Sequence, residues 1–371
     1  MDLLALVTAL LNGDKVFSDI HLRTGLPPMV RGVAGLERLG EEAVVEADLS
    51  GFLDGLTAWR QVLESSSRKD ESEADLAMEI ADQRFRANYF TFSGGTGKGV
   101  VLRRVEAAIR SAAELGLPAS VLNFIDRKSG LVLVCGHAGS GKSTTLASFV
   151  RHISTSRPDH IITIEDPIEF VHASATGLVT QREVGTDSGG FSAALRAAMR
   201  EDPNVIMVGE IRDRETAAAC LAAAESGQLV LGPLHACAAD KAVERLADFF
   251  PSDEKPMQRN IIASNLVGVI AQVLLPDVKR RGRVLAYEIM ANTPAVTNHI
   301  REDHLHMLAN VLTTSAADNM VALNDTLRDL VKRGRVTHED ARRAAYDTKG
   351  FELTANVRAA YASSAVAGAR S

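Results

Sequence analysis

The segment Gly136-His-Ala-Gly-Ser-Gly-Lys-Ser-Thr144 constrains this chain more than any other part of its sequence. It matches the pattern GxxxxGK[ST], follows the apolar run 130–135 and precedes a helical stretch. Glycines let such a loop wrap tightly, so that successive N–H groups point at phosphates, and the N-terminus of the next helix adds partial positive charge. A strand, this loop and a helix in this order predict an α/β core that binds a nucleoside triphosphate.

Each part of this loop has an expected role. Lys142 is expected to reach the β- and γ-phosphates and the Ser143 hydroxyl to ligate Mg²⁺. The alternative is a glycine-rich turn that contains a lysine by chance, and residue frequencies give that match roughly one chance in a hundred in a chain of this length. We therefore expect ATP and Mg²⁺ to be bound here, with the nucleotide contacts Gly136, Ala138, Gly139, Ser140, Gly141, Lys142, Ser143 and Thr144.

From about residue 119, short apolar runs alternate with alanine-rich helical stretches. The runs are 130–135, 160–164, 205–208 and 229–231. Continuous apolar strands are expected where both faces of a sheet are covered. Helices are expected between them at 191–200 and 215–226, the second ending at Gly227. This alternation predicts a mostly parallel sheet, and we expect the section from about 250 onward to be helical.

The first hundred residues have a different texture and predict a small separate α+β domain. A helix is expected at 3–11, strands at 18–22, 29–33 and 84–92, and an exposed loop at 65–73. The predicted organisation is an N-terminal domain, a linker, an ATPase domain with a helical C-terminal part, and a flexible tail, at 1–105, 106–118, 119–361 and 362–371.

Two acidic clusters follow apolar strands downstream of the loop. Carboxylates at the carboxyl ends of parallel strands face the phosphate site, where they can hold Mg²⁺ or polarise water. Where P-loop ATPases commonly carry Asp this chain has Gly209, so the following Glu210 is the expected general base. Glu165 and Asp166 are candidates for holding the metal's water shell, the alternative for each acid being a helix cap or a solvated strand end. His235 ends a fourth strand and either senses the γ-phosphate or caps the next helix.

Charge and cysteine content exclude several other classes of protein. The formal charge of the 371 residues is −6, which argues against a bulk electrostatic grip on nucleic acid. The longest apolar stretch, 261–275, is shorter than the ~20 residues of a membrane-spanning helix and is interrupted by Asn265 and Gln272. Three widely spaced cysteines without a CxxC pair fit a reducing compartment.

Taken together, these stretches resemble the PilT-like secretion and twitching-motility ATPases, a branch of the P-loop motors. The resemblance extends from the N-terminal domain to the helical end near residue 345. It is carried most specifically by the P-loop and by four further segments, 163–170, 181–184, 195–203 and 208–213. It implies a RecA-like ATPase core behind a PAS-like domain. Assembly and secretion ATPases of the same superfamily usually carry a four-cysteine zinc insertion, which this chain lacks, and this favours the PilT-like branch.

The resemblance also implies partners and further site residues. It implies a homohexameric ring in the cytoplasm, peripheral at the inner membrane, that docks on an inner-membrane platform protein and removes pilin subunits from a type IV pilus. Arginines of the family's N-terminal domain approach the nucleotide, and Arg84, Arg86 and Arg103 stand in the matching segments, with surface charge as the alternative.

Departures from the family pattern keep other functions open. The chain has Gln228, Pro233 and Ala236 where the family has His, Thr and Thr. These changes leave nucleotide binding intact but bear on turnover. The alternatives are a weakly hydrolysing scaffold or accessory ATPase of a pilus, conjugation or secretion apparatus and, less favoured by the acidic charge, a DNA-translocating motor.

Overall fold

The computed structural model describes most of the chain, and its described residues form two compact units. One unit comprises residues 1–108 together with 167–171, and the other comprises the remaining residues. Most of the loop expected at 65–73, and the whole tail expected at 362–371, lie outside the described residues. The described ranges are 1–13, 15, 17–32, 35–56, 73–81, 83–105, 109–279, 282–314 and 319–352.

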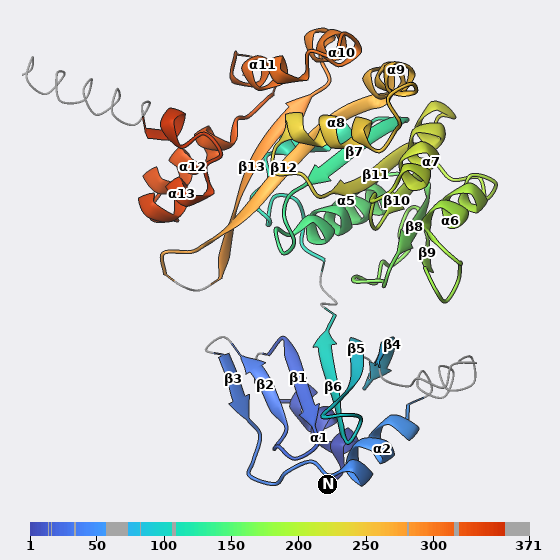
Figure 1. The fold of residues 1–371 in the computed structure, drawn as a ribbon, viewed down its shortest axis with the longest axis vertical. Helices are drawn as coiled ribbons and strands as arrows, with labels where there is room; N and C mark the ends of the chain where they lie inside the picture. The colour runs from blue at the N-terminus through green and yellow to red at the C-terminus, as the bar shows by residue number, and fades with distance from the viewer. Residues whose placement is uncertain are drawn as a thin grey trace, which may run out of the picture. The chain divides into compact units, whose positions relative to one another are not determined.

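The described residues of the first unit form an antiparallel sheet and the helices α1 and α2 (Figure 1). Its strand order is β3-β2-β1-β6-β5-β4. Alternate residues of the central strands, such as Ile20 and Leu22 of β1 and Phe85 and Ala87 of β5, are buried with the helices in one core. Its elements are α1 (Leu3–Leu11), β1 (Asp19–Arg23), β2 (Met29–Gly32), β3 (Gly35–Arg38), α2 (Glu46–Asp54), β4 (Glu73–Ile80), β5 (Gln83–Phe92) and β6 (Gly97–Arg104).

The second unit is built on a seven-stranded sheet in the order β13-β12-β7-β11-β10-β8-β9. All its neighbouring strands pair in parallel except β12 with β13, which confirms the predicted mostly parallel α/β fold. The strands are β7 (Gly130–Cys135), β8 (His160–Glu165), β9 (Leu178–Glu183), β10 (Val205–Val208), β11 (Leu229–Leu234), β12 (Leu266–Pro276) and β13 (Arg283–Ala291).

Helices cover both faces of this sheet, which explains why its central strands are apolar throughout (Figure 1). Leu131 and Leu133 of β7 pack toward α6–α10, whereas Val132 and Val134 pack toward α4 and α5. The helical elements of this unit are η1 (Ala119–Val121), α4 (Leu122–Ile125), α5 (Lys142–Ser156), α6 (Phe191–Ala198), α7 (Arg214–Glu225), α8 (Ala239–Asp248), α9 (Lys255–Asn265), α10 (Pro294–Arg301), η2 (Leu305–Met307), α11 (Leu308–Thr314), α12 (Leu323–Lys332) and α13 (His338–Ala344).

The structure refines two expectations about this unit. The section after residue 250 is not purely helical, because β12 and β13 form a hairpin and β12 pairs with β7. The apolar run 266–275 is a strand buried in the sheet, as β7 is. A continuous apolar run has no periodicity that distinguishes a buried strand from a buried helix. Residues 109–118 are also more than a linker, since Ala112 and Leu117 are buried in the second unit's core.

Candidate functional site

The carboxyl ends of the parallel strands bring the predicted site residues to one edge of the second unit's sheet. The P-loop follows β7, Glu165 ends β8, Glu210 follows β10 and His235 follows β11. Because β11 lies between β7 and β10, the P-loop, His235 and Glu210 come from three adjacent strands. β8 lies one strand further away. This edge is the usual place for a ligand site in a parallel α/β sheet.

The P-loop has the backbone geometry of a phosphate cradle. Gly139 and Gly141 have φ values of 75° and 90°, in the left-handed region that favours glycine. At Gly136, a Cβ atom would lie 2.4 Å from the Ser140 hydroxyl and 2.5 Å from the Gln272 carbonyl oxygen, so only glycine fits. Residues 137–139 are exposed, and α5 begins at Lys142 directly after the loop. The exposed loop and the helix N-terminus provide the amides and partial charge that bind phosphate.

The Lys142 ammonium group lies over the loop. Its Nζ atom donates hydrogen bonds to the carbonyl oxygens of Gly136 at 2.8 Å and His137 at 3.0 Å. The ammonium group is a charged donor with three protons, and phosphate oxygens could accept hydrogen bonds from it as these carbonyl oxygens do. Lys142 is therefore positioned at the mouth of the cradle.

Glu210 and His235 meet beside this cradle. The Nε2 atom of His235 lies 3.8 Å from Oε1 of Glu210, and Nη1 of Arg212 lies 3.9 Å from Oε2 of the same carboxylate. The Glu210 side chain is 35% exposed, so it has access to solvent. Partial burial and the positive charge of Lys142 hold the pKa of His235 below its usual value, although Glu210 opposes this effect. A carboxylate open to water thus lies beside an imidazole whose pKa the lysine helps to lower.

Glu165 and Asp166 differ in their surroundings. Glu165 is buried, and its Oε1 accepts hydrogen bonds from Thr163 at 2.7 Å and from Gln181 at 3.0 Å. Gln181 is on β9, which pairs with β8 on the side away from β10 and the P-loop. Asp166 is exposed. The hydrogen bond from Gln181 to Glu165 therefore ties β9 to β8, and a role of either acid in holding the metal's water shell stays a prediction.

The positions at which the chain differs from the family pattern lie at different distances from the site. Pro233 is inside β11, and its carbonyl oxygen accepts a hydrogen bond from the Ile211 N–H at 3.4 Å, next to Glu210. Gln228 lies at the other end of β11, where its carbonyl oxygen accepts from Gly130 at the start of β7. Its side-chain Oε1 is buried without a partner among the described residues. Of these two changes, only Pro233 adjoins the site.

The site residues fit Mg²⁺ bound through a nucleotide better than Mg²⁺ held by protein alone. Within the described ranges, no group of three or more His, Cys, Asp or Glu is arranged to hold a metal ion. Mg²⁺ usually takes one or two protein oxygens and completes its shell with water and substrate phosphates. Ser143 is exposed in the first turn of α5 and offers one such oxygen.

The structure adds a site residue that the sequence did not single out. Gln272 of β12 is 2% exposed; its Nε2 donates to the Ser140 carbonyl oxygen at 2.8 Å, and its Oε1 accepts from the Thr145 hydroxyl at 3.0 Å. Arg283 of β13 also reaches the loop, with Nη1 donating to the Gly139 carbonyl oxygen at 3.2 Å. A lone glutamine in an apolar strand was the only signal, because its amide needs partners when it is buried.

The three predicted arginines lie on the sheet of the first unit. Arg86 of β5 and Arg103 of β6 are opposite each other in the register, and Arg84 points to the same face two residues earlier. Arg103 donates to Asp19 at 2.7 Å. Burial alone would raise the pKa of Asp19, but hydrogen bonds from Ser18 and Arg103 outweigh it and the pKa is lowered. An approach of these arginines to the nucleotide stays a prediction.

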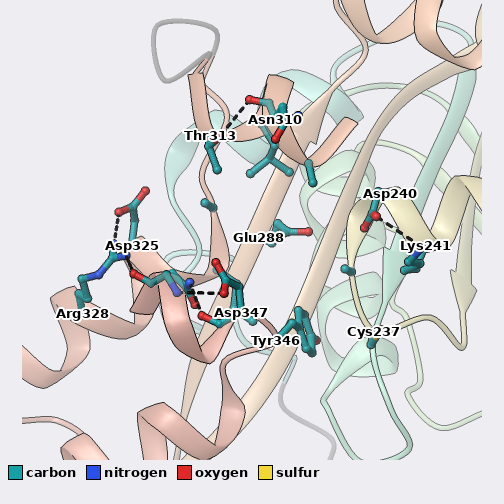
Figure 2. A pocket seen from close by; sticks show the side chains of 17 residues that line it. Cys237, Asp240, Lys241, Glu288, Asn310, Thr313, Asp325, Arg328, Tyr346 and Asp347 are labelled. Carbon is teal, nitrogen blue, oxygen red and sulfur yellow. Dashed lines mark hydrogen bonds and ion pairs between the residues drawn. The ribbon is translucent and has the colours of Figure 1, made fainter. Parts of the chain in front are cut away.

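A cavity of about 650 Å³ borders residues 235–238, the segment between β11 and α8 that we call the His235 loop (Figure 2). Cys237 lines it, two residues after His235. Along its wall, the half-buried Glu288 of β13 accepts a hydrogen bond from the Ala239 N–H at 2.8 Å and a second one from the Leu323 N–H. Burial raises the pKa of Glu288 in spite of these bonds. One carboxylate thus caps the N-termini of both α8 and α12, which fastens the end of the His235 loop.

Comparisons with known proteins agree with this geometry. The profile of the family described as type II/IV secretion system protein matches residues 60–354. The type IV pilus retractation ATPase PilT of Pseudomonas aeruginosa is 40% identical over 338 residues, which cover 90% of this chain and 96% of that protein. A twitching motility protein of Neisseria gonorrhoeae is 43% identical over 282 residues, covering 76% of this chain and 75% of that protein.

A solved structure is similar over nearly the whole chain. The crystal structure of the pilus retraction motor PilT with bound ADP matches with a TM-score of 0.86 and 39% identity. The match covers 95% of this chain and 99% of that one. Among the helices that the structure describes, none combines the length and the apolar character needed to cross a membrane.

Proposed function

The chain belongs to the type II/IV secretion system protein family, as its motifs predicted, and we propose that it is the ATP-hydrolysing subunit of a motor that retracts a type IV pilus. The placement of Lys142, Glu210 and His235 around one P-loop carries the proposal. Similarity to the retraction motor over nearly the whole chain supports the mechanical role, and the ADP in that motor's structure supports an adenine nucleotide as ligand.

In ATP hydrolysis, each of these side chains and the loop has its own role. The amides of residues 136–144 and the Lys142 ammonium bind and orient the phosphates, and they stabilise the charge that builds up during transfer. The Glu210 carboxylate takes the proton of the attacking water, which its partial exposure allows to enter. Neutral His235 hydrogen-bonds near the γ-phosphate. Mg²⁺, with Ser143 as one ligand, would neutralise charge on the β- and γ-phosphates.

The proposal extends to assembly. We infer a homohexamer whose subunits place Arg84, Arg86 and Arg103 near a nucleotide, where the guanidinium fork pairs with two phosphate oxygens. The ring acts in the cytoplasm, at the inner membrane, on a platform protein. ATP binding and product release change the conformation of each subunit in turn, and this movement is passed to the membrane partner.

Two measurements test this function. Deleting the gene in its own bacterium should leave pili on the surface and abolish their retraction, and a plasmid copy should restore retraction unless it carries Lys142→Ala. A deletion strain that makes no pili would indicate an extension motor instead. In vitro, the light-scattering mass of the purified chain with Mg-ATP should equal six copies, and a mass of one or two copies would contradict a ring.

A second function is favoured by the departures from the family pattern, Pro233 above all. This proline removes a backbone donor from β11, one residue before the end of the strand that leads to His235. A weakly hydrolysing scaffold or accessory ATPase would bind ATP and join a ring without sustained turnover. Phosphate release that depends on Lys142 excludes this function, and restoring Thr at position 233 should raise the turnover rate if the proline has lowered it.

A further inference from the structure

We propose that Gln272 is a positioning residue of the P-loop: it fixes the Ser140–Gly141 peptide in the orientation that binds phosphate. The inference rests on the proposed function, because it assigns the loop to a nucleotide. Gln272 lies on β12, 132 positions after Ser140, and its side chain bonds to Ser140 and Thr145. It acts through the loop and is therefore not a catalytic residue.

Gln272 contacts the loop at both ends. Its main-chain oxygen lies where a side chain at position 136 would have to go, 2.5 Å from that Cβ site. Its side-chain Nε2 donates to the Ser140 carbonyl oxygen at 2.8 Å, and its Oε1 accepts from the Thr145 hydroxyl at 3.0 Å. Thr145 is buried in the first turn of α5. One amide group thus fastens the loop to the helix that follows it.

The bond to Ser140 determines which way a loop amide points. In a trans peptide the carbonyl oxygen and the next N–H point in opposite directions. Because the Ser140 oxygen is held toward β12, the Gly141 N–H must point away from β12. Gly141 has φ = 90°, so its backbone has few barriers to other conformations once that anchor is lost. Removing the anchor therefore frees a donor that the cradle needs.

Only an amide satisfies both contacts at neutral pH. The Ser140 oxygen needs a donor and the Thr145 hydroxyl needs an acceptor, and glutamine provides one of each. An ionised glutamate of the same shape would place a negative oxygen against the Ser140 carbonyl oxygen. Protonated, the same glutamate would again provide one donor and one acceptor. Burial raises the pKa of a carboxyl group, so this protonation falls in an accessible pH range.

The test is calorimetric binding of Mg-ADP by the full chain at pH 6.0 and pH 8.5, with the ratio of variant to wild-type Kd taken at each pH. Gln272→Glu should bind at least about 30-fold more weakly at pH 8.5, as expected when a buried polar group loses its partner, and should recover at least about tenfold at pH 6.0. Gln272→Met, which can make neither contact, should lose affinity equally at both pH values. Gln258→Glu on α9 is the charge-matched control and should bind like the wild type.

The outcomes separate this inference from the proposed function. If wild type binds Mg-ADP, Lys142→Ala does not, and Gln272→Glu binds equally weakly at both pH values, then Gln272 only fills space and the inference is wrong. If Gln272→Glu binds like the wild type, it is also wrong. If the wild type binds no Mg-ADP, the proposed function has failed first. Should Gln272→Glu not fold by urea titration, Thr145→Val replaces it, and binding within about twofold of wild type would overturn the inference.

Discussion

His235 Nε2 lies 3.8 Å from Glu210 Oε1, although the two residues follow different strands of the sheet, β11 and β10. Lys142, from the helix after β7, is close enough that its charge lowers the pKa of the same imidazole. Three adjacent parallel strands thus bring a carboxylate, an imidazole and an ammonium group to one edge. The arrangement leads to predictions about turnover, pH dependence and stability.

Replacing Glu210 with Gln should keep ATP binding and lower the turnover rate by about 10²- to 10³-fold, because the amide cannot take a proton from water. Phosphate release gives the rate, and calorimetry gives the Kd. Glu215→Gln, at an exposed position in the first turn of α7, is the control and should leave both unchanged. Turnover of Glu210→Gln near the wild-type rate would show that another group is the base.

The acid side of the pH–rate profile should depend on His235. Because partial burial and Lys142 lower its pKa, the imidazole is neutral at pH 7 and gains its proton only below its usual value of about 6.5. The turnover rate should therefore fall in that acid range as a second positive charge forms beside Lys142. In His235→Gln this fall should disappear, whatever the absolute rate. An unchanged acid limb in the variant would assign it to a different group.

Stability toward acid should be limited by His172. Burial lowers the pKa of this imidazole to about 4, and neither ring nitrogen has a hydrogen-bond partner among the described residues. Between pH 6.5 and 4 the His172 imidazole binds a proton in the unfolded chain but stays neutral in the folded chain. The free energy of unfolding therefore falls as the pH falls, by up to about 3 kcal/mol. Above pH 6.5 this effect is absent.

The check is urea unfolding at pH 7.5, 5.5 and 4.5. His172→Phe should lose less stability than wild type between these pH values, because the ring no longer titrates. His306→Phe, at an exposed position, should follow the wild-type curve. Equal acid sensitivity of His172→Phe and wild type would contradict the assignment.

Gly209 should not tolerate a side chain. A Cβ atom there would lie 3.1 Å from both the Glu165 Cα and the Ile164 carbonyl oxygen, and its N–H donates to that oxygen at 2.7 Å. Gly209→Ala should lower the free energy of unfolding by about 1–3 kcal/mol through this overpacking. Gly189→Ala, where a Cβ meets nothing within 4 Å, is the control and should change it by less than about 0.5 kcal/mol. Equal stability of the two variants would mean that the ends of β8 and β10 move apart at no cost.

The P-loop and the parallel core could be predicted because each depends on local sequence. A GxxxxGKS pattern contains its own loop and helix start, and apolar runs such as 130–135 and 205–208 are β7 and β10 with matching bounds. The order of the strands in the sheet was not predicted, and this order determines which residues lie near the P-loop. Glu165 and Glu210 look alike in sequence, but β8 lies beyond β10, and Glu165 bonds to Gln181 on the far side.

The contribution of β12 could not be predicted, because it depends on contacts between distant parts of the chain. An apolar run after a helix suits a strand or a buried helix equally well, and only its pairing with β7 decides between them. From the sequence, Gln272 could be described only as a polar residue that interrupts that run. Its partners Ser140 and Thr145 are more than 125 residues away, at 132 and 127 positions, and no local pattern signals such a contact.

The most direct test of the account is calorimetry of Mg-ATP with the full folded chain and with Lys142→Ala, followed by phosphate release from the same samples. The account predicts that the wild type binds and releases phosphate, and that the variant shows no heat of binding and no turnover. Absence of binding by the folded wild-type chain, or equal binding by the two proteins, would contradict it.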